Sequence, residues 1–224
     1  MISNIQELLN NPPKVHEWTE GEITASGLPD RTFLYLDEIL TPDMRTLETG
    51  MGISTALFAM KGTNHVCINP EESEKQRLST YCREHGLSLG KMEFVLKTSD
   101  LAVLDKECEG EFDLVLIDGG HGFPTPMIDF HYYASKLKVG GILLLDDTQL
   151  WSVKVLEEFL KESEDWEYDA TLPNKTGVFK RKTSGPVTKE WCFQPYVIKK
   201  TKELEQASVN SSSSKKGWLS KIFD

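Results

Sequence analysis

Three acidic residues in this 224-residue chain stand where they could bind a cation. Asp118 closes one continuous apolar run, and Asp146 and Asp147 close the next. Because the carboxyl ends of parallel strands meet at one edge of a sheet, we expect the three carboxylates to converge there. Carboxylates gathered in this way repel one another, and a hard divalent cation, Mg²⁺ above all, would neutralise them. The alternative is that Asp146 and Asp147 only cap the turn and helix that follow.

His121 lies in a glycine-rich loop, Gly119-Gly-His-Gly-Phe-Pro124, three residues after Asp118. Glycines on both sides permit a backbone that directs the side chain toward the site, and imidazole accepts a hydroxyl proton near neutral pH. We predict that His121 is a general base; a histidine that orders the loop or ligates the metal is the alternative. Among the other four histidines, His131 is expected to pack beside two tyrosines, and no partner pattern surrounds His16, His65 and His85.

A glycine turn, Thr46-Leu-Glu-Thr-Gly-Met-Gly-Ile-Ser-Thr55, joins the end of one expected strand to the start of a helix. Gly50 and Gly52 would let the backbone approach a ligand closely, while Ser54 or Thr55 would cap the helix. The third glycine of a dinucleotide-binding turn is replaced by Thr55, and no Walker sequence is present. With the carboxylate of Glu48 at the strand end, the turn favours a cationic ligand without phosphate. A turn that is merely tight is the alternative.

Short apolar runs alternate with helix-compatible segments between residues 45 and 181, which is typical of a parallel sheet covered by helices. The predicted strands are 45–48, 65–69, 92–96, 112–118 and 141–146, and the predicted helices are 54–60, 71–85, 124–138 and 152–163. Segments 166–172 and 177–181 flank a turn-rich link and predict a hairpin. The expected fold is therefore α/β, a doubly wound, seven-stranded, mostly parallel sheet that ends in an antiparallel hairpin.

These motifs together resemble the class I S-adenosylmethionine-dependent methyltransferases, in the branch of macrocin-type and cephalosporin-hydroxylase-like O-methyltransferases. The resemblance covers residues 40–182. It rests on Glu48-Thr-Gly-Met-Gly-Ile-Ser-Thr, Ile117-Asp-Gly-Gly-His-Gly-Phe, Asp129 and Leu137-Lys-Val-Gly-Gly-Ile-Leu-Leu-Leu-Asp-Asp147. It implies a Rossmann-like methyltransferase fold with S-adenosyl-L-methionine as the cofactor.

The resemblance also assigns cofactor-binding residues by position: Glu48, Gly50 and Gly52 around the methionine part, Asn69 at the ribose, Ser99 and Asp100 near the adenine, and in addition Ser54 and Asp118. Asn69 departs from the pattern, because this fold usually has an acid there to hold the ribose hydroxyls. An amide can hydrogen-bond a hydroxyl without charge, unless Glu71 or Glu72 substitutes. Metal-dependent relatives similar to catechol O-methyltransferase have acids at positions like those of Asp118, Asp146 and Asp147. There a metal would bind the substrate hydroxyls and lower their pKa.

The implied activity is O-methylation of a small-molecule hydroxyl, with a sugar or glycoside among the candidates, assisted by Mg²⁺ and with His121 as the base. Two other classes stay open: a dinucleotide-binding oxidoreductase, and a non-catalytic cofactor-fold module that acts as a scaffold. Nucleic acid is not an expected partner, because 35 acidic and 25 basic residues give a formal charge of −10.

Charge and composition suggest four regions: an N-terminal helical cap (1–40), a methyltransferase domain (41–182), a C-terminal extension (183–207) and a flexible tail (208–224). Residues 174–224 carry a net +7, which leaves −17 on residues 1–173. The tail joins the polar linker 208–214 to a short basic amphipathic segment, 215–224. This segment could dock weakly on an anionic membrane or in a groove of a partner protein. The alternative is a frayed end of the chain.

The aromatic-rich segment 191–198 is expected to pack on the hairpin, or else to cover the substrate pocket or a second copy in a homo-oligomer. Four cysteines without a C-x-x-C pair indicate a reducing compartment. The chain shows neither a signal-peptide pattern nor an apolar run near the roughly 18 residues of a membrane span. We therefore expect a cytoplasmic protein.

Overall fold

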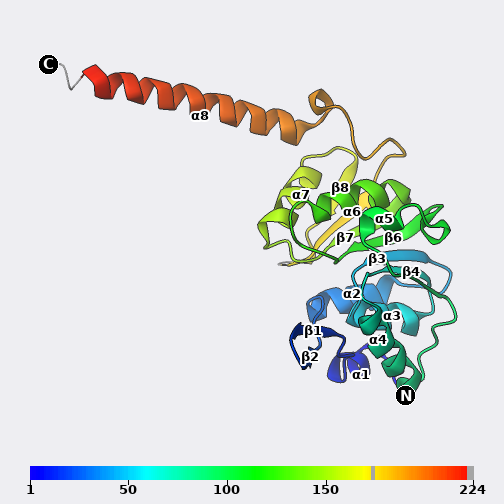
Figure 1. Cartoon of the computed structure of the whole chain (residues 1–224). Helices are drawn as coiled ribbons and strands as arrows, with labels where there is room; N and C mark the ends of the chain where they lie inside the picture. Colours follow the sequence, from blue (N-terminus) through cyan, green and yellow to red (C-terminus); the bar gives the residue numbers. More distant parts are fainter. Residues whose placement is uncertain (173–174, 221–224) are drawn as a thin grey trace.

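A seven-stranded sheet forms the centre of the molecule, with helices on both faces (Figure 1). The computed structural model describes residues 1–172 and 175–220, with side chains as far as 208. The strand order is β5-β4-β3-β6-β7-β9-β8, and only the pairings of β9 are antiparallel. The strands are Arg45–Thr49 (β3), Asn64–Ile68 (β4), Met92–Val95 (β5), Phe112–Ile117 (β6), Leu137–Leu145 (β7), Trp166–Asp169 (β8) and Gly177–Arg181 (β9). The predicted fold class is confirmed.

Continuous apolar runs form the central strands because both faces of the sheet are buried. In β6, Leu114 and Leu116 belong to the core on one face, whereas Val115 and Ile117 belong to the core on the other. The first core packs against Ile5–Asn10 (α1), Asp30–Ile39 (α2), Ile53–Lys61 (α3) and Glu72–His85 (α4). The second packs against Ser99–Ala102 (α5), Thr125–Tyr133 (α6) and Trp151–Lys161 (α7). The carboxyl ends of the parallel strands are thus held by packing from two sides.

The terminal hairpin carries one loop to the functional edge of the sheet. β9 pairs antiparallel with both β7 and β8, and Gly177 at its start lies opposite Leu145 at the end of β7. Lys175 and Thr176, just before β9, therefore lie next to the turn that follows β7. The Thr148 amide donates to the Lys175 carbonyl at 2.8 Å, which joins the two turns directly.

The N-terminal region differs from the expected helical cap. Between α1 and α2 the chain forms a small antiparallel hairpin, His16–Thr19 (β1) and Glu22–Thr24 (β2). Gly21 makes its turn with a left-handed φ of +80°, which glycine adopts without a steric cost. The predicted helix 124–138 is also shorter, because α6 gives way to the 3₁₀ turn Ala134–Lys136 and Leu137 already pairs with Phe112 in the sheet.

The C-terminal region contains the 3₁₀ turn Trp191–Phe193 and a helix, Pro195–Ser220 (α8), that leads away from the sheet (Figure 1). The prediction of a linker at 208–214 is wrong, because the backbone is helical through this stretch. The amphipathic motif at 215–224 lies outside the residues whose side chains are described. In the aromatic segment, Tyr196 packs edge-on against Phe159 of α7, while Trp191 and Phe193 are exposed. In the part of the chain that the structure describes, no helix combines the length and the apolarity needed to cross a membrane.

Candidate cofactor and catalytic site

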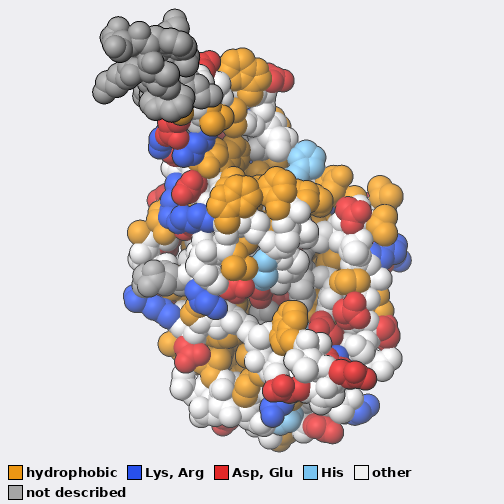
Figure 2. All heavy atoms as spheres, turned by 60° about the vertical axis from the view of Figure 1, so that its left-hand side comes forward, with side chains coloured by type: hydrophobic (Ala, Val, Ile, Leu, Met, Phe, Trp, Pro, Cys, Tyr) orange, Lys and Arg blue, Asp and Glu red, His pale blue; other side chains and the backbone are white. Residues whose placement is uncertain are grey.

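A cavity of about 670 Å³ opens at the carboxyl ends of the parallel strands. The space-filling view in Figure 2 shows a hollow in which acidic side chains and a histidine gather. Its lining comes from the turns after β3, β4, β6 and β7, from the start of α5, from the β1–β2 hairpin and from Lys175. The predicted residues that line it are Gly50, Gly52, Ser54, Asn69, Ser99, Asp100, Asp118, His121, Asp146 and Asp147. The topology thus brings ten of the eleven predicted site residues to one cavity.

The glycine turn needs glycine at its first position. Gly50 has a φ of +91°, and a Cβ built there would lie 2.2 Å from the carbonyl oxygen of Asp118. The close approach of the β3 turn to the β6 turn therefore depends on the absence of a side chain. At the second glycine, the Gly52 amide donates to Thr55 Oγ1 at 2.9 Å, which satisfies one free N–H at the start of α3.

Glu48, the eleventh predicted residue, does not line the cavity. Its side chain is fully buried beneath the glycine turn, where Oε2 accepts from Ser54 Oγ at 2.8 Å and Oε1 accepts from Thr55 Oγ1. His65 Nε2 of β4 lies 3.1 Å from Oε1. The expectation of direct contact with the cofactor is therefore corrected: the carboxylate fixes the start of α3, because its oxygens are already occupied by the chain.

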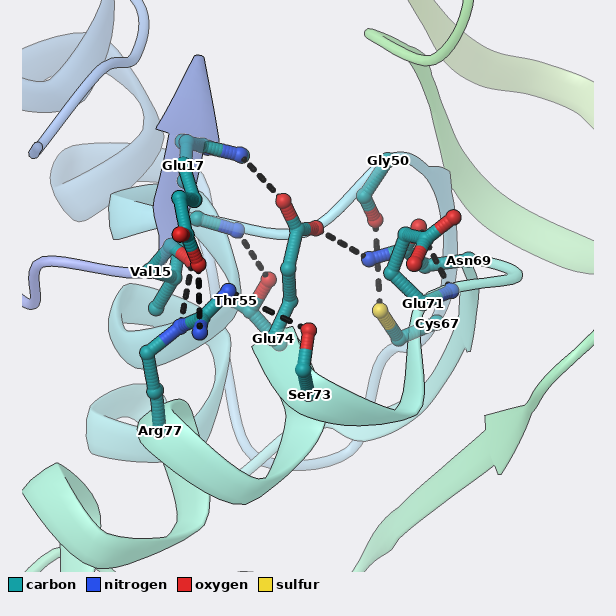
Figure 3. A network of polar contacts seen from close by, with 12 residues as sticks. Val15, Glu17, Gly50, Thr55, Cys67, Asn69, Glu71, Ser73, Glu74 and Arg77 are labelled. Atoms are coloured by element: carbon teal, nitrogen blue, oxygen red, sulfur yellow. Dashed lines mark hydrogen bonds and ion pairs between the residues drawn. The ribbon is translucent and has the colours of Figure 1, made fainter. Parts of the chain in front are cut away.

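Asn69, at the end of β4, belongs to a polar network that includes a carboxylate from α4 (Figure 3). Its amide nitrogen donates to Glu74 Oε2 at 2.6 Å, and the other oxygen of Glu74 lies 2.9 Å from His16 Nδ1 of the hairpin. Burial raises the pKa of Glu74, but hydrogen bonds from His16 and Asn69 outweigh it and bring the pKa below its usual value. Glu71 and Glu74 line the cavity beside Asn69, so carboxylates are present at the corner where the ribose was expected.

The far end of the expected nucleoside site is formed by the start of α5. Ser99 and Asp100 line it together with Lys97 and Thr98. Tyr133 of α6 donates from its hydroxyl to the Ser99 carbonyl at 2.5 Å, which fixes the turn against the core. Ser99 and Asp100 thus share one wall of the cavity, and their place near an adenine stays a prediction.

Asp118, Asp146 and Asp147 follow β6 and β7 and form what we call the acidic end of the cavity. Burial and the nearby carboxylates of Asp146, Glu48 and Asp147 raise the pKa of Asp118 well above its usual value, and burial and Asp147 raise the pKa of Asp146. Asp146 Oδ1 accepts from Thr176 Oγ1 at 3.2 Å. The site therefore crowds three carboxyl groups together, and ionisation of Asp118 and Asp146 is disfavoured there.

Asp147 is the carboxylate of this group with cationic partners. Its Oδ1 lies 3.3 Å from Lys175 Nζ and accepts from Gln149 Nε2 at 2.7 Å. Burial raises its pKa, but the bond from Gln149, the charge of His121 and the contact with Lys175 bring it below the usual value. Its φ of +56° is uncommon outside glycine, although aspartate tolerates it better than most residues. Asp147 is thus ionised and fixed in direction.

His121 faces two of these carboxylates. Its Nε2 lies 3.3 Å from Asp147 Oδ2 and 3.9 Å from Asp118 Oδ1. The side chain is 28% exposed, and the carbonyl of the same residue accepts a hydrogen bond from Ser152 Oγ of α7. When Nε2–H donates to Asp147, the ring nitrogen Nδ1 is left as a proton acceptor. A carboxylate that orients an imidazole in this way is the arrangement of a general base.

Asp129 of α6 lies behind the His121 loop and is fully buried. Neither carboxylate oxygen has a hydrogen-bond partner within the described residues, and a Cβ on Gly119 would be 3.4 Å from Oδ2. Burial raises its pKa, while the nearby hydroxyls of Ser99 and Thr49 oppose the shift. This carboxyl group supports the loop from beneath and does not line the cavity.

The donor types at the acidic end suit Mg²⁺, because all three side chains offer hard oxygen atoms. Their placement in this structure is not that of a ligand set: within the described ranges, no three His, Cys, Asp or Glu side chains are positioned to hold a metal ion. Asp147 is directed to Lys175 and Gln149 instead. The magnesium site stays a prediction.

Several lining residues were not anticipated as site residues: His16 and Trp18 from the β1–β2 hairpin, Glu74, Lys97 and Lys175. Glu71, which we considered as a substitute for a ribose-binding acid, is at the cavity, whereas Glu72 is not among its lining residues. The turn sequence around Lys175 was the available signal for a loop near the site. His16 gave none, because its partner Glu74 is 58 positions away in the chain.

Comparison with known families bears on which ligand such a cavity could bind. Residues 47–148 match the family model of a methyltransferase domain. This segment, which is less than half of the chain, is similar to a methyltransferase domain. The match runs from β3 to the turn after β7 and includes the glycine turn, the His121 loop and the acidic end of the cavity.

Solved structures with the same fold bind or modify different molecules. A candidate caffeoyl-CoA O-methyltransferase from Staphylococcus aureus is 14% identical, with a TM-score of 0.60 over 80% of this chain and 93% of that chain. An rRNA methylase from Streptococcus thermophilus is 16% identical, with a TM-score of 0.53 over 69% and 96%. A methyltransferase from Podospora anserina, solved with S-adenosylhomocysteine, is 15% identical, with a TM-score of 0.53 over 69% and 77%. At these identities the likeness shows the fold. No curated protein matches the sequence.

Proposed function

We propose that this protein transfers a methyl group from S-adenosylmethionine to a hydroxyl group of a small molecule. The observation that carries the proposal is His121, an imidazole 3.3 Å from Asp147 in the same cavity as the Gly50 turn. The similarity to a candidate O-methyltransferase supports oxygen as the acceptor atom. A sugar or glycoside is the first acceptor class to test, since the loop around His121 is part of the resemblance to macrocin-type O-methyltransferases.

The cavity fits the proposed cofactor in both size and construction. The turn at Gly50 and Gly52 leaves room that a Cβ would fill at the first position, and the cavity of about 670 Å³ is in the range of small-molecule sites. Carboxylates line both the Asn69 corner and the end near Asp118. They offer hydrogen-bond acceptors for hydroxyl groups, and their negative electrostatic potential favours a cationic ligand.

In the proposed reaction, the sulfonium of S-adenosylmethionine supplies an electrophilic methyl group. His121 accepts the proton of the acceptor hydroxyl at Nδ1, while Asp147 orients the ring through Nε2. Lys175 and Gln149 fix Asp147 in turn. The chain then contributes mainly by alignment of the acceptor oxygen with the methyl group.

The similarity to an rRNA methylase raises RNA as a second acceptor class. The carboxylates at the acidic end and the formal charge of −10 disfavour a phosphate backbone. Mg²⁺ bound by Asp118, Asp146 and Asp147 is part of the proposal as an assisting ion, since it would relieve their repulsion.

The test combines binding with turnover. Calorimetry with S-adenosylhomocysteine, with and without Mg²⁺, should give saturable binding to the full chain. A panel of sugars, glycosides, catechols and RNA, each incubated with labelled S-adenosylmethionine, should show transfer to one of the hydroxyl compounds. Transfer to RNA alone would refute the small-molecule acceptor. Absence of binding under both conditions would refute the enzyme and leave the non-catalytic module.

A further inference from the structure

We propose that His16 binds the carboxylate at the amino-acid end of the cofactor, so that the N-terminal hairpin supplies a binding residue from outside the segment that matches the family model. This inference rests on the proposed cofactor. It concerns a residue for which neither the sequence pattern nor the family match assigns a role.

The hairpin is fixed to α4 by contacts outside the cavity. Arg77 Nε donates to the Val15 carbonyl at 2.7 Å, and Arg77 Nη1 lies 3.6 Å from Glu17 Oε2. Figure 3 shows Arg77 reaching from α4 toward the hairpin, with Glu74 one turn away on the same side. These contacts hold the backbone of residue 16 above the start of α4.

The ring of His16 is itself fixed in direction. Nδ1 lies 2.9 Å from Glu74 Oε1, and both side chains are 14% exposed. The ring of Trp18 stacks on it, with centroids 5.4 Å apart and 23° between the planes. Because Glu74 accepts at Nδ1, the second nitrogen, Nε2, is the atom left for a ligand.

Nε2 lies beside the glycine turn. A Cβ built on Gly52 would be 3.5 Å from it, and Gly52 is the residue from which α3 begins. The first N–H groups of a helix attract negative charge, and an imidazole that carries a proton on both nitrogens donates from Nε2 as well as from Nδ1. The helix start and the ring thus form one corner with donors on two sides.

The rest of the cavity repels an anion. Glu71, Asp100, Asp118, Asp146 and Asp147 line it elsewhere. Its two lysines are engaged, Lys97 with Asp105 at 2.6 Å and Lys175 with Asp147 at 3.3 Å. An anionic group is therefore best placed at the corner of His16 and Gly52. S-adenosylmethionine and S-adenosylhomocysteine carry one such group, the α-carboxylate.

The experiment compares two ligands, of which only one has the amino-acid end that carries this group. Calorimetry on the full chain would measure S-adenosylhomocysteine, which has the carboxylate, and 5′-methylthioadenosine, which lacks the amino-acid end. We expect His16→Gln to weaken the binding of S-adenosylhomocysteine by about 10-fold or more, which is the range for loss of a hydrogen bond to a charged group. The binding of methylthioadenosine should weaken by less than about 2-fold.

Two variants separate the proposed contact from its alternatives. Arg77→Gln loosens the hairpin without a change in the cavity wall, and His131→Gln removes an exposed histidine of α6. Arg77→Gln should weaken the binding of S-adenosylhomocysteine more than that of methylthioadenosine, because it frees the backbone that carries residue 16, whereas His131→Gln should leave both affinities unchanged. Equal weakening of both ligands by His16→Gln, no weakening at all, or the same selective loss in His131→Gln would overturn the role of His16. Failure of the unaltered protein to bind either ligand would instead refute the proposed function.

Discussion

Replacement of Gly50 by alanine tests whether the two turns at the heart of the cavity must touch. A left-handed φ costs a residue with a Cβ about 1–2 kcal/mol. The new Cβ would also lie 2.2 Å from the Asp118 carbonyl oxygen and 2.9 Å from its carbon, both backbone atoms that cannot rotate away. Overpacking of this kind adds about 1–3 kcal/mol. We therefore expect Gly50→Ala to lower the free energy of unfolding by about 2–5 kcal/mol.

Gly62→Ala is the matched control, because Gly62 has a φ of +67° and no atom within 4 Å of a built Cβ. Gly62→Ala should lower the free energy of unfolding only by the cost of the left-handed backbone conformation, about 1–2 kcal/mol. Urea unfolding of both variants measures the difference, and calorimetry with S-adenosylhomocysteine measures its effect on the site. Gly50→Ala should bind at least about 10-fold more weakly, a loss of about 1.4 kcal/mol, while Gly62→Ala binds normally. Equal stability and equal affinity of the two variants would refute the argument.

Three further outcomes are expected. His121→Gln should lower kcat by about 10²–10⁴-fold and leave the affinity for S-adenosylhomocysteine within about 2-fold; an unchanged kcat would assign the proton to another group. Mg²⁺ at about ten times its Kd should stabilise the protein by about 1.4 kcal/mol and raise Tm by about 3–6 °C, in the unaltered chain but not in Asp146→Asn; equal melting curves would refute the magnesium site. Of the four thiols, Cys192 alone should react with a disulfide reagent at pH 8 before denaturation, because it is exposed whereas burial raises the pKa of the other three; two fast thiols would contradict this.

The central sheet was predictable because its strands are continuous apolar runs that end in polar residues. The β1–β2 hairpin was not predictable, since its residues are mostly exposed and show no alternation of buried and exposed side chains. Its position depends on Arg77 and Glu74, which lie on a helix some 60 positions further along the chain. Contacts of that range leave no periodic signal in a single sequence.

The residues of the site likewise fall into those that the sequence predicted and those that it did not. Residues at strand ends, such as Asp118 and Asp146, were found because the topology of a parallel sheet fixes where strands end. Glu48 was misplaced because its partner His65 becomes a neighbour only when β4 pairs beside β3. Lys175 was missed because its approach to Asp147 depends on the position of β9 within the sheet.

The place of β9 also bears on how the protein is made. It is the last strand of the sheet to leave the ribosome, yet it lies between β7 and β8. Until residue 181 has emerged, β7 presents an unpaired edge and β8 has no strand to join, so the nascent sheet is open to pairing with other chains. A chain that stopped before residue 177 would keep the whole segment matched by the family model and still lack the strand that protects it.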